Sequence, residues 1–281
     1  MARLFLRDVS VQIGTVLIRS RVDAADQAKP TLRVTFSIEK TGARHPNTCE
    51  LAVYNLSKDN RTAVQQRLVP CIVEAGYAGE RSQLFSGDLR FTTSKREGVD
   101  FVTNFTIGDG VKEYTSARFN ENFGPGTAVR DIIEKIAGAL GVGLGNVVEK
   151  LREGGFRAGF DEFTKGAVFS GQASEELDKL MRAVGLEWSI QNGQLQVLKP
   201  KETTKDPAIA LNKASGLIGS PELGEDGIVR GRALLQGQLS PGRLIKLESL
   251  LVDGFFKLTK TIHTGDTWGA DWTTEFEGTP L

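Results

Sequence analysis

The sequence has few of the side chains on which catalysis and metal binding usually depend. It contains two histidines and two cysteines, which form no paired metal-binding motif. His45 lies in residues 42–47, a stretch rich in turn-forming residues, and His263 is followed only by the carboxylates Asp266 and Asp271, a poor ligand set for a metal. A Gly-x-Ser-x-Gly nucleophile motif and a dinucleotide-binding glycine loop are missing too. We therefore expect no enzymatic activity, no cofactor and no metal.

The chain also lacks an excess of charge and a long apolar segment. Its 35 basic and 35 acidic residues balance, whereas a protein that grips nucleic acid usually carries a basic excess. No apolar run reaches the length of a membrane span, and the N-terminal residues do not resemble a signal peptide. Cys49 and Cys71 are interpreted as buried free thiols in a reducing compartment, with a disulfide between them as the alternative. We expect synthesis and assembly in the cytoplasm.

What the sequence does contain is glycine and short alternating strands. Its 32 glycines in 281 residues exceed the usual share of about 7% and are typical of many strands joined by tight turns. Residues 31–39 alternate cleanly and place Leu32, Val34, Phe36 and Ile38 on one face. Ser57 is a plausible N-cap for a helix over residues 58–68. The first segment is therefore predicted to be antiparallel sheet with one solvated face, most simply a barrel or a sandwich.

The middle of the chain changes to a helical pattern. Apolar residues recur at helical spacing from Val129 to Leu140, with Thr127 as the expected N-cap. A second helix is predicted from an N-cap at Ser174 to a stop at Gly185, and a hairpin with a type I′ turn at Asn192-Gly193 follows. These elements predict a small α+β domain. Residues 141–166 give no clear assignment.

Two short segments resemble each other across this middle region. Residues 98–105 and 269–276 share a glycine, an aspartate, a threonine and a phenylalanine at the same spacing. Each segment has the pattern of the closing strand of its own β-rich region. The echo suggests a duplicated β-module, and two unrelated strands with similar turns are the alternative.

Several blocks of the sequence resemble the baseplate hub proteins of contractile-tailed bacteriophages, a family that includes the late-control D proteins. The blocks are residues 48–57, 170–180, 185–188, 215–222, 239–242 and 263–272. The C-terminal blocks are the most specific, and none is a catalytic motif. The resemblance implies a fold that is mainly β, with two tube-like antiparallel β-barrels flanking a small α+β domain. The expected domains are residues 1–118, 119–200 and 201–281.

The same resemblance implies a structural role for the chain. In this family a homotrimer contributes six barrels to a ring beneath the hexameric tail tube and receives the trimeric central spike below. We therefore expect partners in the tube or tube-initiator protein, the spike and other baseplate proteins, with DNA only in transit and no membrane anchor. The expected location is the virion baseplate. Closed rings need equivalent repeated surfaces, which gives the internal echo a reason.

Six residues are predicted to lie in barrel loops or near subunit interfaces: Pro241, Gly242, His263, Asp266, Trp268 and Trp272. Trp272 is also expected to fill the core of the second barrel. Two alternatives stay open. The chain could be the hub of a phage-derived injection system, such as a tailocin or a secretion apparatus, or a tail enzyme that degrades the cell wall.

Overall fold

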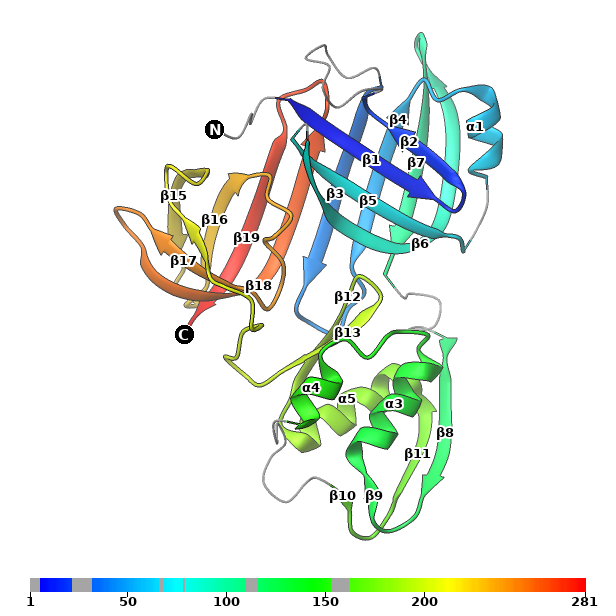
Figure 1. Cartoon of the computed structure of the whole chain (residues 1–281), viewed down its shortest axis with the longest axis vertical. Coiled ribbons are helices and arrows are strands. Elements are labelled where there is room, and N and C mark those ends of the chain that lie inside the picture. The colour runs from blue at the N-terminus through cyan, green and yellow to red at the C-terminus, as the bar shows by residue number, and fades with distance from the viewer. Residues whose placement is uncertain (1–5, 22–31, 66–67, 78, 110–115, 153–161) are drawn as a thin grey trace. The chain divides into compact units, whose positions relative to one another are not determined.

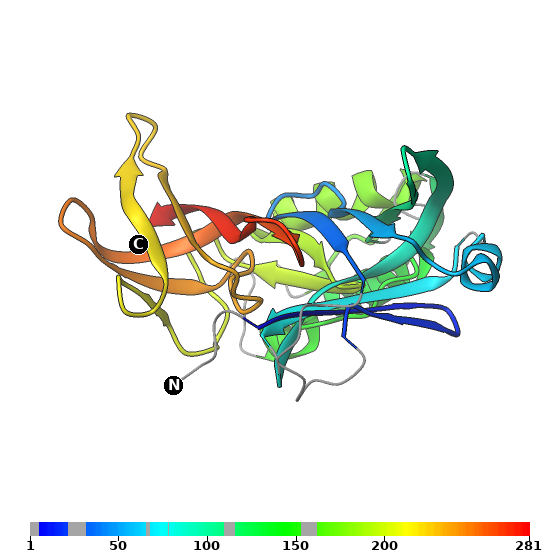
Figure 2. The ribbon, with the colours of Figure 1, turned by 90° about the horizontal axis from the view of Figure 1, so that it is seen from above.

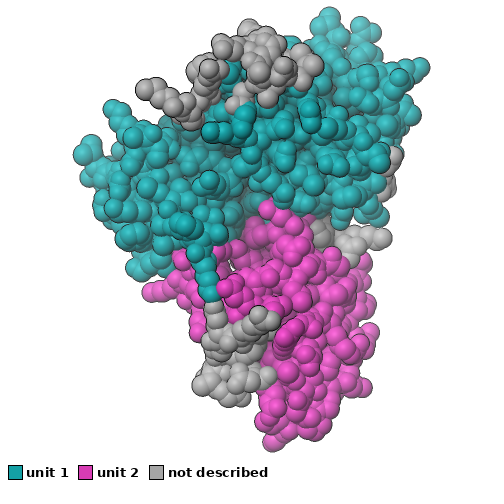
Figure 3. Space-filling model, in the orientation of Figure 1, with its two compact units in different colours: residues 1–40, 47–108, 205–281 teal, residues 41–46, 109–204 magenta. Residues whose placement is uncertain are grey.

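The computed structural model describes residues 6–21, 32–65, 68–77, 79–109, 116–152 and 162–281. The chain forms two compact units, unit 1 from residues 1–40, 47–108 and 205–281, and unit 2 from residues 41–46 and 109–204 (Figure 3). The fold is mainly β, as predicted. None of the helices in the described residues has the length and apolar character needed to cross a membrane.

Unit 1 is built of strands and one short helix. In chain order these are β1 (Arg7–Ile13), β2 (Val16–Arg19), β3 (Val34–Thr41), β4 (Thr48–Tyr54), α1 (Lys58–Ala63), β5 (Pro70–Tyr77), β6 (Glu80–Glu97), β7 (Asp100–Gly108), β14 (Ile209–Leu211), β15 (Leu217–Leu223), β16 (Val229–Leu234), β17 (Leu244–Glu248), β18 (Asp253–Asp266) and β19 (Trp272–Pro280). All of the strands belong to one sheet (Figure 1).

The sheet consists of two modules with the same strand order. We call β3, β4, β7, β6 and β5 the N-module, and β15, β16, β19, β18 and β17 the C-module; in each, the strands pair in the order given. The modules follow one another in the sheet because β18 pairs with β3 (Figure 2). Residues at matching positions of the two modules are called counterparts below.

The equivalence extends to the hairpins β6–β7 and β18–β19, which contain the two echoed segments. Each long strand carries one extra residue relative to its hairpin partner, Arg90 in β6 and Thr259 in β18, and β6 has a second one, Leu84, relative to β5. Such a β-bulge bends a strand and increases its twist. The chain before β5 and β17 also matches, because Leu68 and Gly242 both have positive φ angles and both donate their N–H to the neighbouring long strand. The duplication suggested by the echo is therefore visible in the strand pairing.

The modules differ in what flanks them. In the N-module β5 pairs with β1 in antiparallel fashion, and β1 then pairs with β2. In the C-module β17 pairs with β14, and this pairing is parallel. The pairings among the described strands close no barrel, because the sheet's path ends at β15 and at β2. The division of the chain at residues 118 and 200 stays a prediction.

The cores follow the alternation of the strands. Val34, Phe36 and Ile38 of β3 are buried, as the sequence predicts, and they belong to the core of the N-module. The C-module has a separate apolar cluster that includes Phe276. The opposite face of these strands carries polar side chains such as Glu39, so the sheet has one apolar and one polar face.

Unit 2 contains the predicted helices. Its elements are β8 (Arg118–Phe123), β9 (Thr127–Ala128), α3 (Val129–Ala139), α4 (Val147–Arg152), β10 (Glu162–Phe163), β11 (Ala167–Gln172), α5 (Ala173–Val184), β12 (Glu187–Gln191) and β13 (Gln194–Leu198). The strands form two-stranded sheets, and an apolar core lies between them and the helices. Asn192 and Gly193 both have positive φ angles, which confirms the type I′ turn between β12 and β13.

The predicted helix starts need correction. Thr127 does not cap α3, because its hydroxyl donates to the Gly124 carbonyl and its backbone pairs with Phe163. Ser174 does not cap α5 either; the N-cap is Gln172, and Ser174 lies buried in the first turn. Gly185 ends α5 in a left-handed conformation, as predicted. Ser57 caps α1 as predicted, although α1 ends at Ala63, earlier than expected.

The stretch from 141 to 166, which the sequence left unassigned, is only partly described. Its described part includes the helix α4 and the strand β10. The buried Lys150 of α4 forms an ion pair with Glu202. This contact ties α4 to the chain that follows β13.

Candidate assembly surface

The contact between β18 and β3, which we call the joint, connects the C-module to the N-module. The N–H of Thr267, just after β18, donates to the Val34 carbonyl at 3.0 Å. Further along, the ammonium of Lys260 lies 2.6 Å from the carboxylate of Glu39. The two strands are therefore antiparallel. β18 pairs with β17 over residues 253–257, before the bulge at Thr259, whereas its contacts with β3 named above come from residues after the bulge.

A cluster of side chains fastens the β18–β19 turn to β1 and to the residue before β3. Arg7 donates to the carbonyl oxygens of Asp266 and Ala270, at 2.7 and 3.0 Å, and its guanidinium lies 5.3 Å from the centre of the Trp272 ring. Arg33 donates to the carboxylate of Asp266, with the shortest distance 2.7 Å. Since one arginine binds backbone and the other a carboxylate, the turn is held in both position and orientation.

The pKa shifts of Asp266 and Arg33 agree with an ion pair that holds the β18–β19 turn in place. Burial by itself raises the pKa of Asp266, but hydrogen bonds from Arg33 and from the backbone N–H groups of Trp268 and Gly269 outweigh it and lower the pKa below its ordinary value. The hydrogen bond to Asp266 also raises the pKa of Arg33. Both groups stay ionised at neutral pH, so the ion pair is fully formed.

Three of the predicted site residues meet at the joint. Asp266 lies in it, and Trp272 packs edge-to-face against Phe36 and Tyr77, with ring centres 5.7 and 6.4 Å apart. Trp272 is therefore buried as predicted, but within the core that includes the N-module residues. His263 lies in β18 and not in a loop; it is fully buried, and its Nδ1 is 2.9 Å from the hydroxyl of Thr274.

The other three predicted residues lie elsewhere. Pro241 and Gly242 are buried in the turn before β17, where the Gly242 N–H donates to the Leu258 carbonyl at 2.7 Å. Trp268 lies in the β18–β19 turn and is more than half exposed. The sequence did not single out Arg7 or Arg33, because their partners are more than 200 positions away in the chain and no local pattern connects them.

Cys49 and Cys71 are both free and buried in the N-module core. Burial raises the pKa of both thiols, that of Cys71 to about 12. A thiol with so high a pKa is neutral at physiological pH and does not act as a nucleophile. The interpretation as buried free thiols therefore agrees with the structure.

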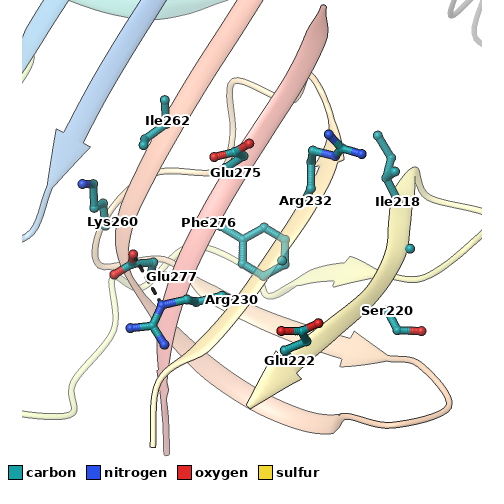
Figure 4. Close-up of a pocket in the computed structure, with 12 residues that line it drawn as sticks. Ile218, Ser220, Glu222, Arg230, Arg232, Lys260, Ile262, Glu275, Phe276 and Glu277 are labelled. Atoms are coloured by element: carbon teal, nitrogen blue, oxygen red, sulfur yellow. Dashed lines mark ion pairs between the residues drawn. The ribbon is translucent and has the colours of Figure 1, made fainter. Parts of the chain in front are cut away.

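A shallow hollow of about 360 Å³ lies on the polar face of the C-module, beside the end strand β15 (Figure 4). Its charged side chains have both signs: Glu222, Arg230, Arg232, Lys260, Glu275 and Glu277. Alternating charges of this kind suit a hydrated surface better than a site for one ionic ligand. Among the described residues no cluster of three or more histidines, cysteines and carboxylates could hold a metal.

Solved structures share this fold at low sequence identity. A 43 kDa tail protein of prophage MuSo2 from Shewanella oneidensis superposes with a TM-score of 0.67 and 8% identity, over 98% of this chain and 97% of that chain. A tail protein from Neisseria meningitidis gives a TM-score of 0.67 and 11% identity, over 98% and 96%. The chain therefore has the fold of phage tail proteins.

A component of a type VI secretion system is also similar. This E. coli protein, itself described as similar to the T4 bacteriophage tail proteins gp27 and gp5, gives a TM-score of 0.61 and 10% identity, over 96% of this chain and 76% of that chain. No family model and no curated protein matches the sequence. The property that this chain shares with these proteins is the fold.

Proposed function

We propose that the chain is a structural baseplate hub of a phage tail, a homotrimeric adaptor between the hexameric tail tube and the trimeric central spike. The duplicated module carries this proposal. Three chains with two equivalent modules each would offer six similar surfaces to a hexamer, while the whole chains would offer three to a trimer. The fold shared with phage tail proteins supports the same role. In the ring the two modules would act as the two tube-like barrels.

The polar face of the sheet suits the wall of a channel. Across the two modules this face carries acidic and basic side chains in neighbouring positions, among them the Lys260–Glu39 ion pair. On the adjoining strands the Thr106 hydroxyl donates to the carboxylate of Glu50 at 3.0 Å. A wall with balanced charge attracts a passing nucleic acid weakly, because tight binding to phosphates needs a basic excess. We therefore assign this face to the channel through which the tail contents pass.

The symmetry of the purified assembly tests the proposal. Light scattering gives the mass, and electron micrographs of the particles give the symmetry. A trimer with threefold symmetry and six similar lobes in a ring is the expected result. A stable monomer at high protein concentration, or a ring with another number of chains, would contradict the trimeric hub.

A second candidate is a hub of a phage-derived injection system, which the similarity to the type VI secretion component favours. The two roles share the fold and differ in the particle that contains the hub. Assembly of the chain into virions would indicate the phage-tail role. A cell-wall-degrading enzyme is the least favoured role, and the described residues contain no group of three or more histidines, cysteines and carboxylates that could hold a catalytic metal. A peptidoglycan-hydrolysis assay on the purified protein tests it, and release of muropeptides would overturn the structural role.

A further inference from the structure

The N-module has a strand edge that corresponds to the edge of β18 at the joint, but no strand of the described residues pairs with it. In the C-module, the part of β18 after the bulge pairs with β19 on one side and with β3 on the other. Its counterpart is the part of β6 after Arg90, within which residues 92–97 pair with β7 on one side and with no strand of the described residues on the other. An unpaired strand edge of this kind exposes backbone groups that can pair with another strand.

The strand that would complete this edge exists at the opposite end of the same sheet. β15 occupies the position in the C-module that β3 occupies in the N-module, and it is the end strand of the sheet (Figure 4). β3 is covered by β18, whereas the outer edge of β15 has no partner strand among the described residues. One chain therefore carries both halves of a second joint, at two separate edges.

Comparison of counterparts shows which side chains are exposed at the two edges that a second joint would use. Ile38 of β3 is fully buried, whereas its counterpart Leu223 of β15 is 57% exposed. Trp272 at the start of β19 is 2% exposed, whereas its counterpart Phe101 at the start of β7 is 40% exposed. Trp272 is covered across the joint by Phe36, Tyr77 and Arg7, and Ile38 lies on the strand that the joint pairs. The exposed members therefore mark the surface that an equivalent contact would bury.

The register of the joint predicts which residues would meet. The hydrogen bond between Thr267 and Val34 places Thr264 opposite Ser37. The strand pairings make Lys95 of β6 the counterpart of Thr264, and Glu222 of β15 the counterpart of Ser37. A second joint with the same register therefore sets a lysine directly opposite a glutamate. Opposite charges at such positions stabilise a strand pair.

We propose that residues 92–97 of β6 pair with β15 of a second copy of this chain, and that this contact repeats the joint between copies. The inference rests on the proposed trimeric hub and names the surface that builds it. Repetition of one contact, within and between copies, alternates N- and C-modules and closes a ring. Pro221 and the bulge in β15 restrict what can pair with this edge, as is common where an edge must not bind indiscriminately.

Engineered disulfides test the proposal directly. The two natural cysteines are buried, so a new surface cysteine reacts alone. The full chain with Lys95→Cys is mixed with the full chain with Glu222→Cys, and the mixture is oxidised by air. We expect covalent dimers that contain one copy of each variant, and covalent trimers when both changes are in one chain. Each variant alone should stay without disulfide-linked copies.

The control pairs Lys95→Cys with Asp253→Cys, an exposed residue at the other end of β18. Dimers in this control at the level of the test pair would overturn the proposal. So would a chain that is oligomeric by light scattering but forms no dimers through Lys95→Cys and Glu222→Cys. That result leaves the trimeric hub intact, whereas a chain that stays monomeric at every concentration contradicts the hub as well.

A charge exchange gives a second test without disulfides. Lys95→Glu alone and Glu222→Lys alone place like charges opposite each other, and each should weaken association about two- to fivefold in sedimentation experiments, the range typical of exposed ion pairs. The chain with both changes restores opposite charges and should associate as the unchanged chain does. Circular dichroism confirms that each variant is folded. Additive weakening in the double variant would contradict the proposed register.

Discussion

Replacement of Trp272 by alanine tests the joint most directly. The side chain is 2% exposed and lies between Phe36, Tyr77 and the guanidinium of Arg7. Truncation of a buried aromatic residue costs about 3–5 kcal/mol of unfolding free energy, and the edge-to-face contacts and the cation–π contact are part of that cost. We expect a loss of about 4 kcal/mol for unit 1 in urea denaturation followed by circular dichroism.

The site of the damage is as informative as its size. Amide hydrogen exchange should accelerate at the joint, including the Thr267 N–H, because loss of Trp272 loosens the β18–β19 turn. Phe101→Ala is the matched control, since Phe101 is the counterpart of Trp272 and is 40% exposed in the single chain; both variants are compared at a protein concentration at which the chain is monomeric. It should cost less than about 2 kcal/mol and leave the joint protected. Equal losses from the two substitutions, or a loss below about 1 kcal/mol for Trp272→Ala, would refute the reasoning.

Three further predictions follow from the same region. Burial lowers the pKa of His263 from 6.5 to about 3, so below about pH 6.5 the unfolded chain binds a proton that the folded chain does not. The free energy of unfolding from urea titrations should therefore fall by up to about 1.4 kcal/mol for each unit by which the pH is lowered from 6.5 towards 3, and His263→Gln should flatten this profile. Gly242 has a φ of 88°, so Gly242→Ala should cost about 1 kcal/mol or more, whereas Gly138→Ala in α3 should stabilise; equal thermal shifts would contradict this. Cys49 and Cys71 should resist thiol reagents until the protein unfolds, and a melting temperature that changes on reduction would reveal an unexpected disulfide.

Local patterns in the sequence predicted the strands well. The alternation around Phe36 gave both the strand and its buried face, because a half-buried strand repeats every second residue. The echo marked the closing strands of the two modules, where Phe105 and Phe276 are both buried. These features depend on neighbours in the chain, so they can be read without coordinates.

The ends of the helices and the joint were harder to predict from the sequence, for two different physical reasons. Thr127 has the right chemistry for an N-cap, but a hydrogen bond to Gly124 and pairing with β10 give its backbone another use. The joint depends on residues distant in the sequence, such as Arg33 and Asp266. No local pattern in the sequence connects two residues so far apart. The sequence therefore predicts Trp272 in the core of its own barrel and not at the contact between modules.

The extra residue in β18 has a consequence for how this sheet tolerates change. A strand that stays straight keeps the same neighbours along its whole length, whereas β18 switches from β17 to β3 at Thr259. Deletion of Thr259 would make Leu258 and Lys260 adjacent, opposite Gly278 and Glu277, so the pairing with β19 would continue without a bulge and every later side chain would keep its face. His263 would stay opposite Thr274 on the buried face, and what the shortened strand would lose is the bend at which β18 leaves β17 for β3.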